Sequence, residues 1–298
     1  MKEISTIFDT TKTNIPQRRD VEAIIGAALN AADPYTAVVS NIQLCENRVQ
    51  IDGQEFSLTP RSRLIVIGLG KAAPAMLNGA ISLLGDLVSA GLCVSKVEVS
   101  PEKMVSGIHY LKGNHPVPGE GSQEAGKAIQ EILRGLNPED LVLLLLSDGG
   151  SALATLPVNG VTLGDMQQLT DTLLRSGATI SEMNSVRKHL DLIKGGGLLR
   201  MAAPARVVAL VLSDVVGSPL DVIASGPAYP DPSTFSNALG VVGRAENYGL
   251  IPVSIREHLE NGVRGLIAET VKPGDELAES ASHTIIGSNK ESCLAAAR

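Results

Sequence analysis

Short runs of consecutive apolar residues alternate with longer amphipathic segments along most of the chain. Apolar runs bounded by glycine or polar residues are typical of strands that are buried on both faces. The pattern predicts strands at 63–69, 91–95, 109–112, 141–146, 206–212 and 283–286. Because helical patterns separate most of these runs, the sequence indicates βαβ units and a mostly parallel sheet.

Helical periodicity and end signals predict the helices that connect the strands. The predicted ranges are 16–32, 71–84, 122–136, 162–176, 181–192, 233–248 and 290–298. Ser122 is the expected N-cap of the third, and Thr162 with Asp165 forms a capping-box pattern. An antiparallel pair at 47–51 and 54–58 is joined by Asp52-Gly53, a favoured two-residue turn. We expect one three-layer α/β/α Rossmann-like domain over residues 1–298.

Composition excludes several classes of protein. The 298 residues carry a net charge of −7, only 2% are aromatic and none is Trp, which disfavours nucleic-acid binding. The longest apolar run, 141–146, is too short to cross a membrane, and the N-terminus has no signal-peptide pattern. Three widely spaced cysteines fit a reducing compartment. We therefore expect a cytoplasmic protein with small-molecule partners, and a homodimer is compatible with this composition.

Four glycine-rich, polar segments follow predicted strands, where an open parallel sheet places its ligands. The first contains Gly68, Gly70 and Lys71, with a Gly-x-Gly-x-x-Ala spacing that lets an anion approach a helix N-terminus. Lys71 fits phosphate binding or an exposed surface lysine equally well. The segment lacks the P-loop pattern, since Ile65 and Ala72 occupy two of its defining positions. The acidic ribose partner of a dinucleotide site is also missing after the second strand.

The second and third segments offer a histidine and an anion nest. His115 lies in a loop fixed by prolines and glycines, where it fits an acid, a base, a phosphate donor or a structural residue. In the third segment, Gly149 and Gly150 allow backbone N–H groups to converge, and Ser147 and Ser151 add hydroxyl donors. A tight strand-to-helix turn explains the same residues.

The fourth segment is the richest in charge. Asn184, Arg187 and Lys188 are predicted to share one helix face, which aims an amide and two cations in one direction. A solvated face with an Arg187–Asp191 pair is the alternative. Lys194 precedes a glycine triplet, which indicates a close backbone approach.

Further along this segment, Asp214 follows a predicted strand as a metal ligand, a hydroxyl partner or a helix N-cap, and Ser225-Gly226 comes later. Cations, hydroxyls and glycines in this combination suit phosphoryl transfer, which depends on positioning and charge neutralisation. The sequence contains neither the Gly-x-Ser-x-Gly motif of hydrolases nor the His-Glu-x-x-His motif of zinc enzymes.

Segments 66–76, 113–122, 145–153, 183–199 and 213–235 resemble, in the same order, motifs of the glycerate 2-kinase family. The resemblance implies transfer of the γ-phosphoryl group of ATP, with Mg²⁺, to the 2-hydroxyl of D-glycerate, giving 2-phosphoglycerate. It also implies that residues 1–298 are the family's N-terminal domain, without the C-terminal MOFRL domain that helps close the cleft. We therefore expect a truncated kinase of reduced activity.

The resemblance implies catalytic roles for Lys71, Arg187 and Asp214, with Asp214 also a candidate Mg²⁺ ligand. Taken with the four segments, it gives these binding candidates: Gly68, Gly70, His115, Ser147, Gly149, Gly150, Ser151, Asn184, Lys188, Lys194, Ser225 and Gly226.

The chain departs from the family pattern at three positions. Asp148 stands where glycine is usual, Asp191 where serine is common, and Ser218 where aspartate is common. Asp148 should weaken phosphate binding unless a metal bridges the two groups. Two alternative functions remain open: an NAD(P)H-dependent hydroxypyruvate reductase, and a non-catalytic remnant that needs a partner chain.

Overall fold

A computed structural model describes residues 18–45 and 48–298, so the predictions for 16–17 and 47 lie outside the described residues. Its centre is a six-stranded sheet in the order β6-β5-β4-β7-β8-β9, and every strand pair in it is parallel. The strands are β4 (Leu64–Leu69), β5 (Val88–Ser95), β6 (Ile108–Lys112), β7 (Leu141–Leu146), β8 (Arg206–Ser213) and β9 (Ala281–Ser288). All six predicted strands and the parallel sheet are confirmed.

The strand order places a switch point between β4 and β7. The chain builds the sheet outward from β4 through β5 to β6, and then outward in the other direction from β7 through β8 to β9. Leu69 at the end of β4 pairs with Leu146 at the end of β7, so the two following turns begin side by side. Crevices at such a reversal are where open α/β sheets bind ligands.

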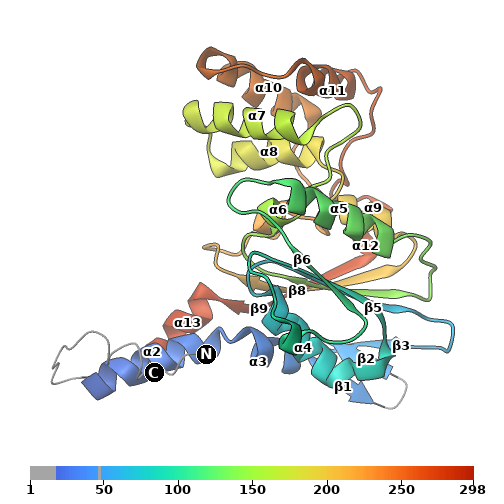
Figure 1. The fold of residues 1–298 in the computed structure, drawn as a ribbon, viewed down its shortest axis with the longest axis vertical. Helices are drawn as coiled ribbons and strands as arrows, with labels where there is room; N and C mark the ends of the chain where they lie inside the picture. The colour runs from blue at the N-terminus through green and yellow to red at the C-terminus, as the bar shows by residue number, and fades with distance from the viewer. Residues whose placement is uncertain (1–17, 46–47) are drawn as a thin grey trace.

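Helices cover both faces of the sheet, as expected (Figure 1). One face carries α3 (Pro34–Val39), α4 (Ala73–Leu84) and a small antiparallel sheet of β1 (Ile42–Cys45), β2 (Arg48–Ile51) and β3 (Gln54–Ser57). The other face carries α5 (Glu120–Ile132), α6 (Gly150–Leu153) and α9 (Gly197–Ala202). Every residue of β4 and of β7 is buried, which explains their continuous apolar sequences.

Four helices form a further layer that the three-layer prediction did not include. They are α7 (Leu163–Arg175), α8 (Ile180–Leu190), α10 (Phe235–Ala245) and α11 (Val253–Val263). This helical unit has its own apolar cluster and lies beyond α5 and α9, at the top of Figure 1. The capping box at Thr162 begins α7 as predicted, whereas α5 begins after Gly119 and Ser122 occupies its N3 position.

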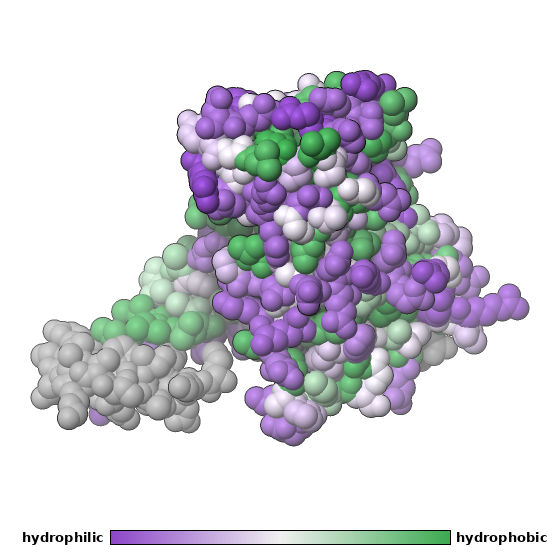
Figure 2. All heavy atoms as spheres, turned by 45° about the horizontal axis from the view of Figure 1, so that its top comes forward, coloured by the Kyte–Doolittle hydropathy of each residue, from purple (hydrophilic) through white to green (hydrophobic). Residues whose placement is uncertain are grey.

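The remaining elements lie at the ends of the chain and in its loops. Helix α2 (Arg18–Ala31) packs beside α13 (Asn289–Ala296), and their exposed apolar side chains form the green area next to the grey atoms in Figure 2. The short elements are η1 (Gly85–Leu87), η2 (Pro101–Lys103), η3 (Ile223–Ser225), η4 (Glu246–Tyr248) and α12 (Glu276–Glu279). Among the described residues, no helix is long and apolar enough to cross a membrane.

Candidate active site at the sheet edge

The turns after β4 and β7 are locked against each other. Gly70 has a φ of 138°, and a Cβ atom there would lie 2.2 Å from the Ser147 hydroxyl oxygen. That hydroxyl accepts a hydrogen bond of 3.0 Å from the backbone N–H of Ala72. The backbone N–H of Lys71 donates to the carbonyl of Asp148 over 2.8 Å. Glycine is therefore required at position 70 for packing of the two turns as well as for backbone conformation.

An ion pair joins the side chains of these two turns. The ammonium group of Lys71 contacts the carboxylate of Asp148, and the two side chains remain 42% and 39% exposed. Exposed pairs of this kind contribute at most about 1 kcal/mol to stability. The Asp148 carboxylate therefore neutralises Lys71, but a competing anion can displace it at little cost.

Two adjoining pockets open at this edge, and together they form what we call the sheet-edge site. The first has a volume of about 240 Å³. Its lining includes these residues of the predicted segments: His115, Asp148, Gly149, Ser151, Asn184, Arg187 and Asp214. The second, of about 160 Å³, is lined by Lys71 and Ser147 and shares Asp148 and Asp214 with the first. Residues far apart in the sequence thus lie at the same edge of the sheet, with Arg187 lining the first pocket and Lys71 the second.

A chain of hydroxyl and amide groups connects this site to α8. The hydroxyls of Ser151 and Ser225 lie 2.7 Å apart, and Ser225 donates to the amide oxygen of Asn184 over 3.1 Å. Ser225 and Asn184 are buried, so these bonds fix the N-terminal half of α8 against α6. The remaining predicted glycines have backbone roles: Gly68 lies within β4, Gly150 begins α6, and the carbonyl of Gly226 accepts from Gly196 over 2.8 Å.

His115 lies close to both charged members of the ion pair. Burial lowers its pKa, and the positive charges of Lys71 and Lys96 lower it further, although Asp148 acts in the opposite direction. Its Nδ1 atom is buried without a hydrogen-bond partner in the structure. The imidazole is therefore favoured in its neutral form, which has one donor and one acceptor nitrogen.

Two neighbouring cations of helix α8, Arg187 and Lys188, lie in different environments. Arg187 lines the sheet-edge site, and its burial lowers the pKa of its guanidinium group, while Asp191 opposes that shift. The Lys188 side chain is only 4% exposed, and its ammonium lies 3.2 Å from Asp231 and 3.5 Å from Asp221. The prediction that Asn184, Arg187 and Lys188 aim in one direction is therefore wrong for Lys188, which occupies a buried ion pair.

Lys194 is also held away from the sheet-edge site. Its buried ammonium pairs with Asp191 and donates to the carbonyl of Ala154 over 3.1 Å. Burial lowers the pKa of Lys194, and the nearby Asp191 carboxylate raises it. The glycine triplet beside it packs against the protein itself, because a Cβ on Gly196 would lie 2.5 Å from the Val271 Cβ.

The sequence interpretation missed two acids that complete these buried pairs. Asp231 has a fully buried side chain that accepts hydrogen bonds from Ser233 and Thr270, and Asp221 lies 3.5 Å from Lys188. Both acids lie within the 213–235 segment that was singled out for its motif. Their spacing in the sequence gave no signal, because their partner Lys188 is more than 30 residues away, on α8.

These features define the class of the protein: a Rossmann-like α/β protein with two adjoining polar pockets at the switch point of its sheet. A family model described as a domain of unknown function, DUF4147, matches residues 20–260. The chain is 38% identical to a glycerate 2-kinase of Pyrococcus horikoshii, over 92% of this chain and 60% of that protein. It is 45% identical to a D-glycerate 2-kinase of Thermotoga maritima, over 70% of this chain and 48% of that protein.

The fold comparison agrees with these sequence matches. A crystal structure of a Pyrococcus horikoshii protein superimposes with a TM-score of 0.85 at 36% identity, covering 96% of this chain and 63% of the other. The chain therefore belongs to the glycerate kinase family that carries this domain. It spans about half to three fifths of the length of the two kinases that it matches.

Proposed function

We propose that the sheet-edge site binds ATP and D-glycerate and transfers the γ-phosphoryl group to the 2-hydroxyl of glycerate. The observation that carries this proposal is the meeting of Lys71, Arg187 and Asp214 at the switch point of the sheet. Phosphoryl transfer needs cations around the transferring group and a polar group that orients the acceptor hydroxyl. The kinase names of the matched relatives support the same reaction.

Each of these residues has a distinct part in the proposed reaction. Lys71 leaves Asp148 and contacts the transferring phosphoryl group, while Arg187 binds an anionic group of a substrate in the adjoining pocket. Asp214 orients the 2-hydroxyl and accepts its proton as the oxygen attacks the γ-phosphorus and the bond to the ADP oxygen breaks. Ser147 and Ser151 offer hydroxyl donors beside the turn, and neutral His115 donates one hydrogen bond.

Mg²⁺ fits the oxygen donors that line this site. Asp148 and Asp214 line both pockets, and Mg²⁺ in nucleotide sites prefers one or two carboxylates together with substrate phosphates. In the described part of the chain, no group of three or more His, Cys, Asp or Glu residues forms a candidate metal cage. We therefore propose that the ion arrives with ATP and that Asp148 holds it, which converts the unusual aspartate from a repelling group into a ligand. When bound, the ion neutralises phosphate charge.

A reducing cytoplasm is the proposed compartment. Cys45, Cys93 and Cys293 are unpaired, and burial raises the pKa of the Cys93 thiol to about 12, which keeps it protonated.

A coupled assay that follows ADP release tests the proposed reaction. We expect ADP release that depends on ATP, Mg²⁺ and D-glycerate together, with 2-phosphoglycerate as the product. A parallel titration with NADH, followed by nicotinamide fluorescence, is expected to show no saturable binding. Saturable NADH binding with no glycerate-dependent ADP release would replace the kinase proposal with the reductase alternative.

A further inference from the structure

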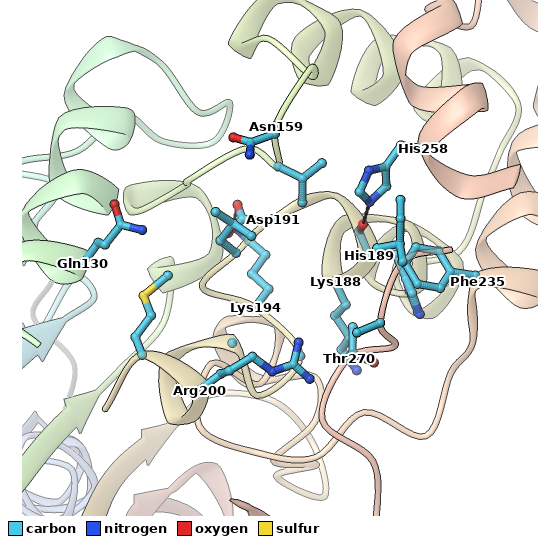
Figure 3. A pocket seen from close by; sticks show the side chains of 17 residues that line it. Gln130, Asn159, Lys188, His189, Asp191, Lys194, Arg200, Phe235, His258 and Thr270 are labelled. Atoms are coloured by element: carbon cyan, nitrogen blue, oxygen red, sulfur yellow. Dashed lines mark hydrogen bonds and ion pairs between the residues drawn. The ribbon is translucent and has the colours of Figure 1, made fainter. Parts of the chain in front are cut away.

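A cavity of about 540 Å³ lies away from the proposed active site, between α9 and the helical unit (Figure 3). Gln130 of α5 and Arg200 and Met201 of α9 form one side, and Phe235 and His258 of the helical unit form the other. None of these residues lines the sheet-edge site. The volume lies within the range of about 300–1,000 Å³ that is common for small-molecule sites. We call this space the interlayer cavity.

The walls of the interlayer cavity are largely apolar. Val158, Leu192, Met201 and Ile267 contribute aliphatic or thioether side chains. The Phe235 ring adds an aromatic surface and meets the His189 ring edge-on, with 4.7 Å between centroids. A chain with only three phenylalanines thus places one of them, together with two histidines, in this wall. Such walls favour an occupant with a compact apolar body.

The acid in the cavity floor is already neutralised. Asp191 has no exposed side-chain surface, pairs with Lys194 and accepts a hydrogen bond of 2.6 Å from Thr155. Lys188, the other buried cation of the lining, faces Asp231. The floor therefore neither repels an anion strongly nor provides a free carboxylate for a cation.

Arg200 differs from these paired groups because it is exposed. One of its guanidinium nitrogens donates to the carbonyl of Glu269 over 2.9 Å. Within residues 18–45 and 48–298, no carboxylate forms an ion pair with it. A guanidinium group has five N–H donors, so most of them stay available for a ligand. The exposed amides of Gln130 and Asn159 line the same cavity and add further donors.

We propose that the interlayer cavity is a second ligand site, which takes a small carboxylic acid with an apolar body. The carboxylate binds the Arg200 guanidinium, for which paired N–H···O bonds are the favoured geometry. The apolar body packs against Met201, Ile267 and Phe235. This site is separate from the proposed kinase reaction and does not depend on it.

Isothermal titration of the whole chain with 3-phenylpropanoate tests this site. We expect saturable binding with a dissociation constant below about 1 mM, which is reasonable for a ligand of this size. The neutral amide of the same acid should bind at least about tenfold more weakly, because it lacks the charge that Arg200 recognises. Inorganic phosphate, which has charge but no apolar body, should also bind more weakly.

Two variants and one control locate the binding. Arg200→Gln should weaken binding of 3-phenylpropanoate about tenfold or more, and Ala268→Trp should block it by filling the cavity. Arg264→Gln removes an exposed arginine that directly follows α11 and lines neither site, and it should bind as the original chain does. Thermal unfolding checks that each variant is folded. The proposal is overturned if the original chain does not bind, if the amide binds equally well, if Arg200→Gln has no effect, or if ATP displaces the acid.

Discussion

The sheet-edge site and the interlayer cavity both contain lysine–aspartate pairs, yet the pairs differ in burial. Lys71 and Asp148 at the sheet edge are each about two-fifths exposed, whereas Lys194 and Asp191 beneath the cavity are almost completely buried. An exposed pair exchanges its partners for water or a ligand at little cost. A buried pair cannot, because separation leaves an uncompensated charge in the interior.

This difference separates ligand binding from structural support among residues that look alike in the sequence. Lys71 has a partner that a phosphate can replace, and Asp148 is then free to hold a cation. Lys188 and Lys194 satisfy buried acids that fix α8 and the following turn. We therefore propose ligand contact for Lys71, and a supporting role for Lys188 and Lys194.

The largest expected effect is a loss of stability in Lys194→Ala. The variant leaves Asp191 buried without its cation, and we expect the free energy of unfolding to fall by about 3–5 kcal/mol. Lys71→Ala, which breaks the exposed pair, should cost less than about 1 kcal/mol. Urea unfolding followed by circular dichroism measures both.

A double variant controls for the size of the lysine side chain. Lys194→Met with Asp191→Asn removes both charges and keeps an acceptor for Thr155, so it should recover much of the lost stability. Equal losses in Lys194→Ala and Lys71→Ala would show that burial does not separate the two pairs.

The second effect concerns turnover, and it is expected for Lys71, the lysine whose loss costs little stability. Lys71→Ala should lower kcat of the proposed glycerate kinase reaction on the order of 100-fold, because one charge-stabilising donor is lost. Lys103→Ala, an exposed lysine in η2 that lines neither site, is the matched control and should leave turnover unchanged. Near-normal turnover in Lys71→Ala would remove Lys71 from the proposed reaction.

The sheet and the meeting of its glycine-rich turns at one edge were predictable because their signals are local. Apolar runs such as 141–146 identify strands that are buried on both faces, and the tight Gly70 turn is visible as a glycine pattern. The convergence of distant turns followed from one general property, namely that parallel strands end at the same edge. No long-range contact had to be known to predict it.

The buried pairs and the helical unit were not predictable in the same way. Amphipathic periodicity shows that α7, α8 and α10 bury one face, but it does not show whether that face meets the sheet or other helices. Arg187 and Lys188 are neighbours in sequence, yet consecutive residues point about 100° apart around a helix. That rotation sends one to the sheet-edge site and the other to Asp231.

A third, smaller effect tests whether the exposed aspartate holds the proposed cation. Asp148→Asn keeps the size of the side chain but removes its charge, so the Mg²⁺ concentration that gives half-maximal activity should rise about tenfold. Asp86→Asn, which makes the same change at an exposed position of η1 outside both pockets, is the control. If Asp148 only repels phosphate, its variant will instead bind ATP more tightly with no change in the Mg²⁺ requirement.

The smallest effect tests the helical unit while leaving both lysine pairs intact. Asp165 accepts a hydrogen bond from the Thr162 backbone N–H, which lowers its pKa, and burial opposes this only in part. A carboxyl whose pKa is lowered in the folded state stabilises the fold at pH values above its ordinary pKa of 3.8. This contribution disappears as the pH falls through the folded-state pKa. Asp165→Asn keeps the accepting oxygen but loses the charge near the start of α7. We expect a loss of about 0.5 kcal/mol at pH 7 and less at pH 3, measured by urea unfolding. An equal loss at both pH values would show that hydrogen-bond geometry, not charge, makes the difference.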